Sequence, residues 1–127
     1  MMAKFFKTDG DYLEAIIEVA GQRLVVMDDF QGSEMRPWHE FNVELSAMII
    51  DPGEWEDIFS GNKAHEKGLK RLDSWGYLAF GEVESINPVI VDCGLLKVTD
   101  PFFTHDVRCV GEFVAFRVAR LDACKGT

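Results

Sequence analysis

The chain has 127 residues, 47% of them hydrophobic and 12% aromatic, which is the composition of one globular domain that folds without disulfide bonds. Thirteen Lys and Arg residues against 22 Asp and Glu residues give a net charge of −9, which opposes binding to phosphate backbones or anionic lipid. These numbers exclude a disordered chain and make nucleic acid an unfavoured partner. They leave a basic protein as the partner that electrostatics favours.

The cysteines and the N-terminus bear on the cellular compartment. Cys93, Cys109 and Cys124 are an odd number and include no Cys-x-x-Cys pair, so the sequence encodes neither a complete disulfide set nor a zinc knuckle. The N-terminal segment lacks the apolar stretch and cleavage site of a signal peptide, and no apolar run has the length of a membrane span. We therefore predict a cytoplasmic protein that does not enter a membrane.

The first predicted element is a β-hairpin with strands over 13–20 and 23–30. The two-residue turn between them starts at Gly21, and Gly suits the first position of a type II′ turn. This turn places Ile17 opposite Val26 on an apolar face, so that register and burial agree.

Residues 40–51 show the cleanest alternation of apolar and polar side chains in the chain, which predicts a long half-buried strand. Asp51 then fits a helix cap, with Pro52 at the first helical position and Glu54 three residues after the cap. We predict one or two short helices between Pro52 and Asp73. The second half of this segment fits either a helix or a loop.

The segment from Trp75 to Leu121 predicts a series of short strands, because its apolar stretches are separated by turn residues too closely for intervening helices. Gly81 inside the first of these strands indicates a bulge or a sharp bend. A short hairpin follows over 89–98, and a final strand over 112–121.

The predicted fold is mainly β, at the margin of α+β: a small curled antiparallel barrel or sheet of five to seven strands. It forms a single domain over 1–127, made of an N-terminal hairpin and long strand (12–51), a helical or loop segment (52–73) and a C-terminal β segment (75–121). The spacing of the strands in about the last 45 residues resembles that of oligonucleotide/oligosaccharide-binding (OB) barrels. The helical segment precedes these strands instead of lying between the third and fourth, so the order of elements differs.

Catalytic candidates are few. Cys93, His105 and Asp106 have the residue types of a thiol nucleophile, its base and an orienting carboxylate. However, alternation puts Cys93 in phase with Val89 and Val91, which favours a buried, inert thiol. We predict no catalytic residue, with those three as the only candidates. The chain has no glycine-rich phosphate loop and no paired metal-ligand spacing, so we predict no cofactor and no metal.

The preferred functional hypothesis is a non-enzymatic binding protein, immunity-like or adaptor-like, that recognises a basic protein partner through an acidic face. Trp is a common interface anchor, and strand alternation places acidic side chains on outer faces. The predicted contact residues are Trp38, His39, Glu40, Glu44, Trp55, Glu82 and Glu84.

Two other functions stay open. The first is an OB-like barrel that binds single-stranded nucleic acid or a small ligand through cations interleaved with aromatic rings. Its residues would be Lys67, Lys70, Arg71, Trp75 and Tyr77. The second is a cysteine-dependent enzyme. A homodimer is also open, because an exposed strand edge in a chain of this size can pair with a second copy.

Overall fold

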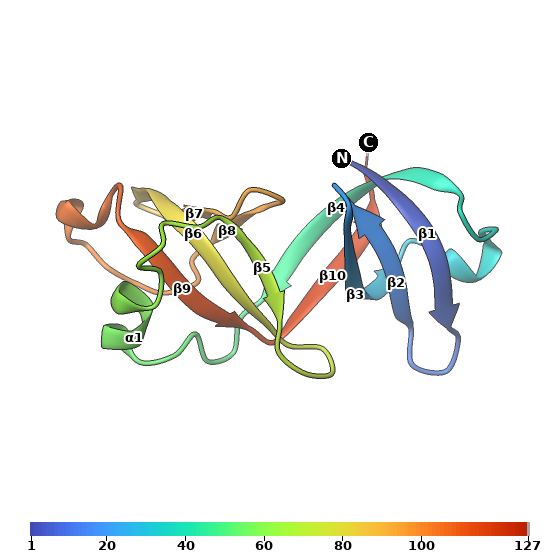
Figure 1. Ribbon diagram of the computed structural model, residues 1–127, viewed down its shortest axis with the longest axis horizontal. Helices are drawn as coiled ribbons and strands as arrows, with labels where there is room; N and C mark the ends of the chain where they lie inside the picture. The colour runs from blue at the N-terminus through green and yellow to red at the C-terminus, as the bar shows by residue number, and fades with distance from the viewer. Residues whose placement is uncertain (127) are drawn as a thin grey trace. The chain divides into compact units, whose positions relative to one another are not determined.

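The computed structural model describes residues 1–126, and it confirms the predicted fold class, a mainly β protein with a small barrel and few short helices (Figure 1). None of the helices in this part of the chain has both the length and the apolar character needed to cross a membrane. The strands are β1 (Met2–Asp9), β2 (Glu14–Val19), β3 (Gln22–Asp29), β4 (Glu40–Met48), β5 (Gly68–Arg71), β6 (Tyr77–Ile86), β7 (Val89–Asp92), β8 (Lys97–Thr99), β9 (Phe113–Val118) and β10 (Arg120–Lys125). The helices are α1 (Trp55–Ser60) and the 3-10 turns η1 (Gly32–Glu34) and η2 (Val107–Cys109).

The chain divides into two compact units. Unit 1 consists of residues 1–47 together with the residues from Arg120 onward, and unit 2 consists of residues 48–119. Unit 2 is therefore an insertion in the sequence of unit 1. The single domain over 1–127 stays a prediction.

Unit 1 is a closed barrel with the strand order β1-β2-β3-β10-β4. β4 pairs back to β1, with Ala3 opposite Phe41, and β10 runs parallel to β3. In Figure 1 this barrel joins blue strands from the start of the chain to a red strand from its end. Its interior contains aromatic rings that pack against each other, because the Phe30 ring centroid lies 6.0 Å from that of Phe5 and 4.8 Å from that of Phe41.

The predicted hairpin is present as β2 and β3, but its register differs by two residues. Ile17 lies opposite Leu24 instead of Val26. The turn residues are Ala20 and Gly21, with φ angles of 51° and 81°, and positive φ at both central positions is the requirement of a type I′ turn. A shift of two residues keeps every side chain on its predicted face, so the apolar face still points into the barrel.

β1 has no counterpart among the predicted elements. Its alternation is interrupted by a register shift between Phe5 and Lys7, which is the signature of a β-bulge. Ala3 and Phe5 are buried before the bulge, whereas Lys7 after it is exposed. The bulge hides the period-2 pattern from sequence inspection.

Unit 2 is a curled antiparallel sheet built around β6, which pairs with β5, β7 and β9. The predicted hairpin over 89–98 is confirmed as β7 and β8, with Val91 opposite Val98. The predicted irregularity in β6 is also present, but the bulge lies between Val83 and Ser85. Gly81 instead permits close approach, because a Cβ atom there would lie 2.5 Å from the Asp92 carbonyl oxygen.

The final predicted strand and the segment after α1 differ from the predictions. The final strand predicted over 112–121 is two strands, β9 in unit 2 and β10 in unit 1, separated at Ala119. Val118 and Leu121 are both buried, so apolar residues continue through the break and conceal it. The open segment after α1 is neither a helix nor only a loop, because β5 pairs Leu69 with Ala79 of β6.

The helix begins later than predicted, at Trp55, with Glu54 as its N-cap residue. Gly53 has a φ of 111°, which no right-handed helix contains, so the helix cannot extend back to Pro52. The Asp51 carboxylate accepts a hydrogen bond of 3.0 Å from the Gly53 N–H and thus closes a turn before the helix.

Replacing Gly81 by Ala tests the close approach in unit 2. The added Cβ would collide with backbone of β7, so we expect the free energy of unfolding to fall by about 1–3 kcal/mol. Gly10→Ala is the matched control, because a Cβ there would meet no heavy atom within 4 Å. Chemical denaturation measures both variants, and equal stability of the two would contradict the close approach.

Candidate functional site

The structure distributes the predicted partner-contact residues over both units. Unit 1 contains Trp38, His39, Glu40 and Glu44, and unit 2 contains Trp55, Glu82 and Glu84. The residues of each unit therefore lie in a chemical environment of their own.

Trp55 is the best-supported anchor of the predicted set. It is 50% exposed, and its ring centroid lies 4.7 Å from that of Phe59 and 6.0 Å from that of Phe102. Phe102 in turn contacts the buried ring of Phe116 at 6.5 Å. This series of ring contacts fixes the exposed indole to the core of unit 2, which lowers the entropy lost when a partner contacts it.

Carboxylates surround Trp55 in the sequence, and we name them with it the Trp55 surface: Asp51, Glu54, Trp55, Glu56 and Asp57. All five residues are exposed, and none of the ion pairs within residues 1–126 involves them. The segment 50–61 contains no Lys or Arg. The negative charge of this surface is therefore uncompensated by neighbours in its own segment.

The acidic residues of β6 are in a different environment. The Glu84 carboxylate accepts a hydrogen bond of 2.8 Å from Lys97, and this bond raises the pKa of Lys97 above its ordinary value. Glu82 lies opposite Asp92, whose carboxylate is 3.0 Å from the Lys67 ammonium. These lysines reduce the negative potential of the β6 surface, so Glu82 and Glu84 are weaker candidates for attracting a basic partner.

Trp38 lies beside cations, not in an acidic patch. Its indole is 63% exposed, contacts the Phe6 ring at 4.8 Å, and has the Lys4 ammonium 5.8 Å from its ring centroid. Glu40 lies directly opposite Lys4 across β1 and β4. The predicted grouping of Trp38 with Glu40 is therefore a surface of mixed charge.

The residues of the predicted nucleic-acid or ligand site do not form an aromatic platform. Tyr77 is only 1% exposed because it faces inward on β6, so its ring cannot stack on a ligand. Lys67 is engaged by Asp92, and the Arg71 guanidinium donates two hydrogen bonds, of 2.8 and 3.2 Å, to the Ser74 carbonyl oxygen. Lys70 is exposed and Trp75 is half-buried. The placement of Tyr77 at a ligand surface was wrong.

Cys93 is fully buried, and this burial, with a smaller contribution from Asp92, raises the pKa of its thiol to about 12. A nucleophilic cysteine needs the opposite shift, because the thiolate is the reactive form. The environment therefore fits the favoured prediction of Cys93 as a small hydrophobic core residue.

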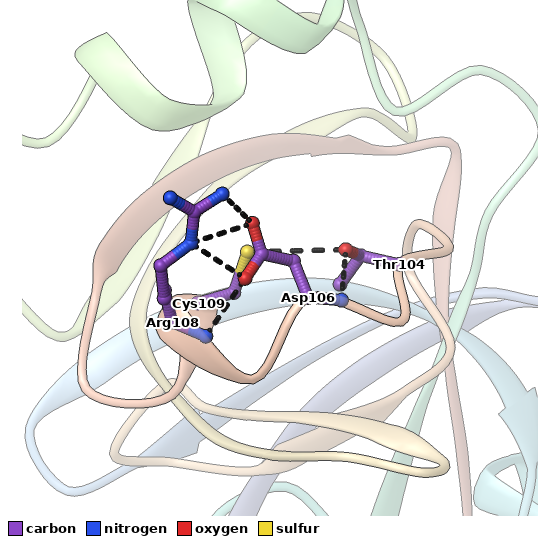
Figure 2. Close-up of polar contacts among 4 residues, drawn as sticks. All are labelled: Thr104, Asp106, Arg108 and Cys109. Carbon is purple, nitrogen blue, oxygen red and sulfur yellow. Dashed lines mark hydrogen bonds and ion pairs between the residues drawn. The ribbon is translucent and has the colours of Figure 1, made fainter.

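The Asp106 carboxylate is engaged by Arg108, as Figure 2 shows. It accepts hydrogen bonds from the Arg108 N–H at 3.0 Å and from the Arg108 guanidinium at 2.7–3.2 Å. These bonds lower the pKa of Asp106 to about 2. The His105 ring instead packs edge-on against Phe103, with 4.7 Å between the centroids.

The loop around Asp106 is tied down by Thr104, whose hydroxyl oxygen accepts a hydrogen bond from the Asp106 N–H at 3.0 Å and lies 3.9 Å from the Cys109 sulfur (Figure 2). Cys109 is buried beneath the loop. These contacts hold residues 104–109, which closely follow Phe102, the ring that supports Trp55, in the chain. Sequence inspection missed this support, because Phe102 is distant from Trp55 in the chain and no local pattern pairs them.

A hollow of about 420 Å³ in unit 1 was also missed; it is lined by residues that include Asp28, Glu34 and Lys125. The Asp28 carboxylate there is 8% exposed and accepts hydrogen bonds from the Thr8 hydroxyl at 2.7 Å and from the Phe30 and Gly32 N–H groups. Its hydrogen-bonding capacity is used within the barrel, so we assign it a structural role.

Among residues 1–126, no group of three or more His, Cys, Asp or Glu side chains is arranged to hold a metal ion. The chain matches no known protein-family model, no curated protein and no solved structure. The resemblance of the C-terminal part to an OB barrel stays a prediction.

Thiol labelling tests the assignment of Cys93 to the core. In the native protein we expect Cys124, which is partly exposed, to react first, and Cys93 to react only when denaturant is added. In the Cys124→Ser variant, native labelling should become slow at every pH at which the fold persists. Rapid native labelling that maps to Cys93 would contradict a buried thiol with a raised pKa.

Proposed function

We propose that the protein is a non-enzymatic binding module that recognises a basic protein partner through the Trp55 surface of unit 2. The observation that carries this proposal is a half-exposed indole, fixed to the core by Phe59 and Phe102, among four exposed carboxylates that have no ion pair within residues 1–126. An anchored aromatic side chain with charged neighbours is a common arrangement at protein interfaces.

The charge and the indole have different roles in this proposal. Exposed carboxylates without an ion pair increase the rate at which a basic partner arrives and orient it, whereas burial of the indole slows its departure. The net charge of −9 acts in the same direction as the local carboxylates. The proposed compartment is the cytoplasm, and the three cysteines are free thiols, which is compatible with a reducing environment.

Affinity capture from native cytosol, followed by binding kinetics with the protein captured, tests this function. We expect a basic protein that is released by high salt. Trp55→Ala should weaken its binding by at least about tenfold, mainly through faster dissociation. Glu54→Lys with Glu56→Lys should slow association and reduce its dependence on salt.

The double variant Glu82→Lys with Glu84→Lys is the matched control, because it changes the net charge equally within unit 2 but at the surface compensated by lysines. It should have a smaller effect on association than the variant at the Trp55 surface. Equal effects of both double variants would mean that overall charge, not this site, governs binding. Unchanged affinity in Trp55→Ala would remove the indole from the interface.

A further inference from the structure

A row of charged residues crosses four neighbouring strands on the outside of the barrel in unit 1. Lys4 in β1 lies opposite Glu40 in β4 on one side and Glu18 in β2 on the other. Glu18 lies opposite Arg23 in β3. The charged row is therefore Glu40, Lys4, Glu18 and Arg23, with charges that alternate in sign across β4, β1, β2 and β3.

The four side chains form no ion pair with each other; within residues 1–126 the ion pairs all involve other residues. The two cations lie over aromatic rings instead. The Arg23 guanidinium is 4.3 Å from the Phe6 ring centroid, and the Lys4 ammonium is 5.8 Å from that of Trp38. The carboxylates of Glu18 and Glu40 are thus available to cations from outside the molecule.

We propose that the charged row docks against the same row of a second copy in a two-fold symmetric dimer. A two-fold axis parallel to the strands and passing between Lys4 and Glu18 reverses the row of the second copy. Glu40 then faces Arg23 of the second copy, and Lys4 faces Glu18 of the second copy. Every position meets the opposite charge, which is the self-complementarity that an isologous interface requires.

Two exposed apolar side chains flank the charged row. Trp38 is 63% exposed and Met2 is 58% exposed, and both lie beside Lys4, Met2 on the same face of β1 and Trp38 through its ring contact. A shallow hollow of about 170 Å³, lined in part by Lys4, Glu18 and Glu40, offers space for a side chain of the second copy. Trp38 supplies the aromatic anchor that charge pairs at an exposed surface lack. This inference is independent of the partner proposed for the Trp55 surface.

Single charge reversals and their mixture test the dimer by analytical ultracentrifugation. The wild-type protein should show a mass that rises from monomer to dimer with concentration. In a dimer of the Lys4→Glu variant, the glutamate at position 4 faces Glu18 of the second copy, so two carboxylates repel each other at both contacts. In a dimer of the Glu18→Lys variant, the lysine at position 18 faces Lys4 of the second copy, so two ammonium groups repel each other. Each variant alone should dimerise at least about tenfold more weakly than the wild type.

An equimolar mixture of Lys4→Glu and Glu18→Lys should dimerise again, because every facing pair between the two different chains then has opposite charge. Changes inside one molecule cannot produce this recovery. Trp38→Ala, which leaves the charges unaltered, should weaken the wild-type dimer as well. The pair Lys63→Glu and Glu66→Lys, in unit 2, is the control and should leave dimerisation unchanged.

A wild-type protein that stays monomeric at every concentration would overturn the proposal, as would a mixture of folded variants that does not associate. Circular dichroism establishes that each variant is folded. If either charge variant does not fold, the wild-type mass and the Trp38→Ala variant decide the question without it.

Discussion

The barrel of unit 1 depends on a strand that the chain supplies last. β10 pairs in parallel with β3 and is the neighbour of β4 in the strand order, so without it the sheet would remain open with two unpaired edges. All of unit 2 lies between β4 and β10 in the sequence. The insertion is compatible with closure because the Ala119 N–H donates a hydrogen bond of 2.8 Å to the Met48 carbonyl oxygen, which holds the two ends of unit 2 together. The Gly126 N–H donates similarly to the Asn42 carbonyl oxygen, at 2.9 Å, and so ties the end of β10 to β4.

Those elements whose burial has a period of two could be predicted from the sequence. β2 and β4 bury alternate residues, and β3 buries Leu24, Val26 and Asp28 on one face with Val25 buried as well. A strand with one buried face imposes its alternation directly on the sequence. The buried and exposed faces of the hairpin were predicted correctly even though its register was not. A shift by two residues leaves every side chain on the same face of the strand. β1 was not predicted because its bulge interrupts the alternation of buried and exposed residues. The boundary between β9 and β10 was not predicted because buried residues continue on both sides of it. Which sheet a strand joins is decided by contacts far along the chain.

The candidate sites were predictable as residue types but not as environments. Trp55 was predicted as a contact residue from its residue type, whereas its support by Phe102 and the compensation of Glu84 by Lys97 come from long-range contacts. The burial of Tyr77 could have been predicted from the sequence, because Tyr77 lies on the same face of one strand as Ala79 and Val83, which are buried. For Trp38, the residue next in sequence is His39 and then Glu40, whereas its neighbours in space are Phe6 and Lys4. The closeness of Trp38 to Glu40 in the sequence therefore suggested an acidic surface, whereas the fold places the Lys4 ammonium beside the indole.

The contrast between the two exposed tryptophans follows from how each is held. Trp55 rests on rings that lead into the core of unit 2, and its charged neighbours in the sequence, over residues 51–57, all have one sign. Trp38 has a φ of 72°, which is unusual for a residue with a bulky side chain, and backbone hydrogen bonds between Phe5 and the loop around Trp38 maintain this conformation. A surface with one sign of charge selects partners by their charge, whereas a surface with alternating signs selects by register, because a displacement of one strand brings like charges together. Two exposed indoles in one acidic chain can therefore serve different recognition tasks, and the difference lies in the charges that the fold places beside each of them.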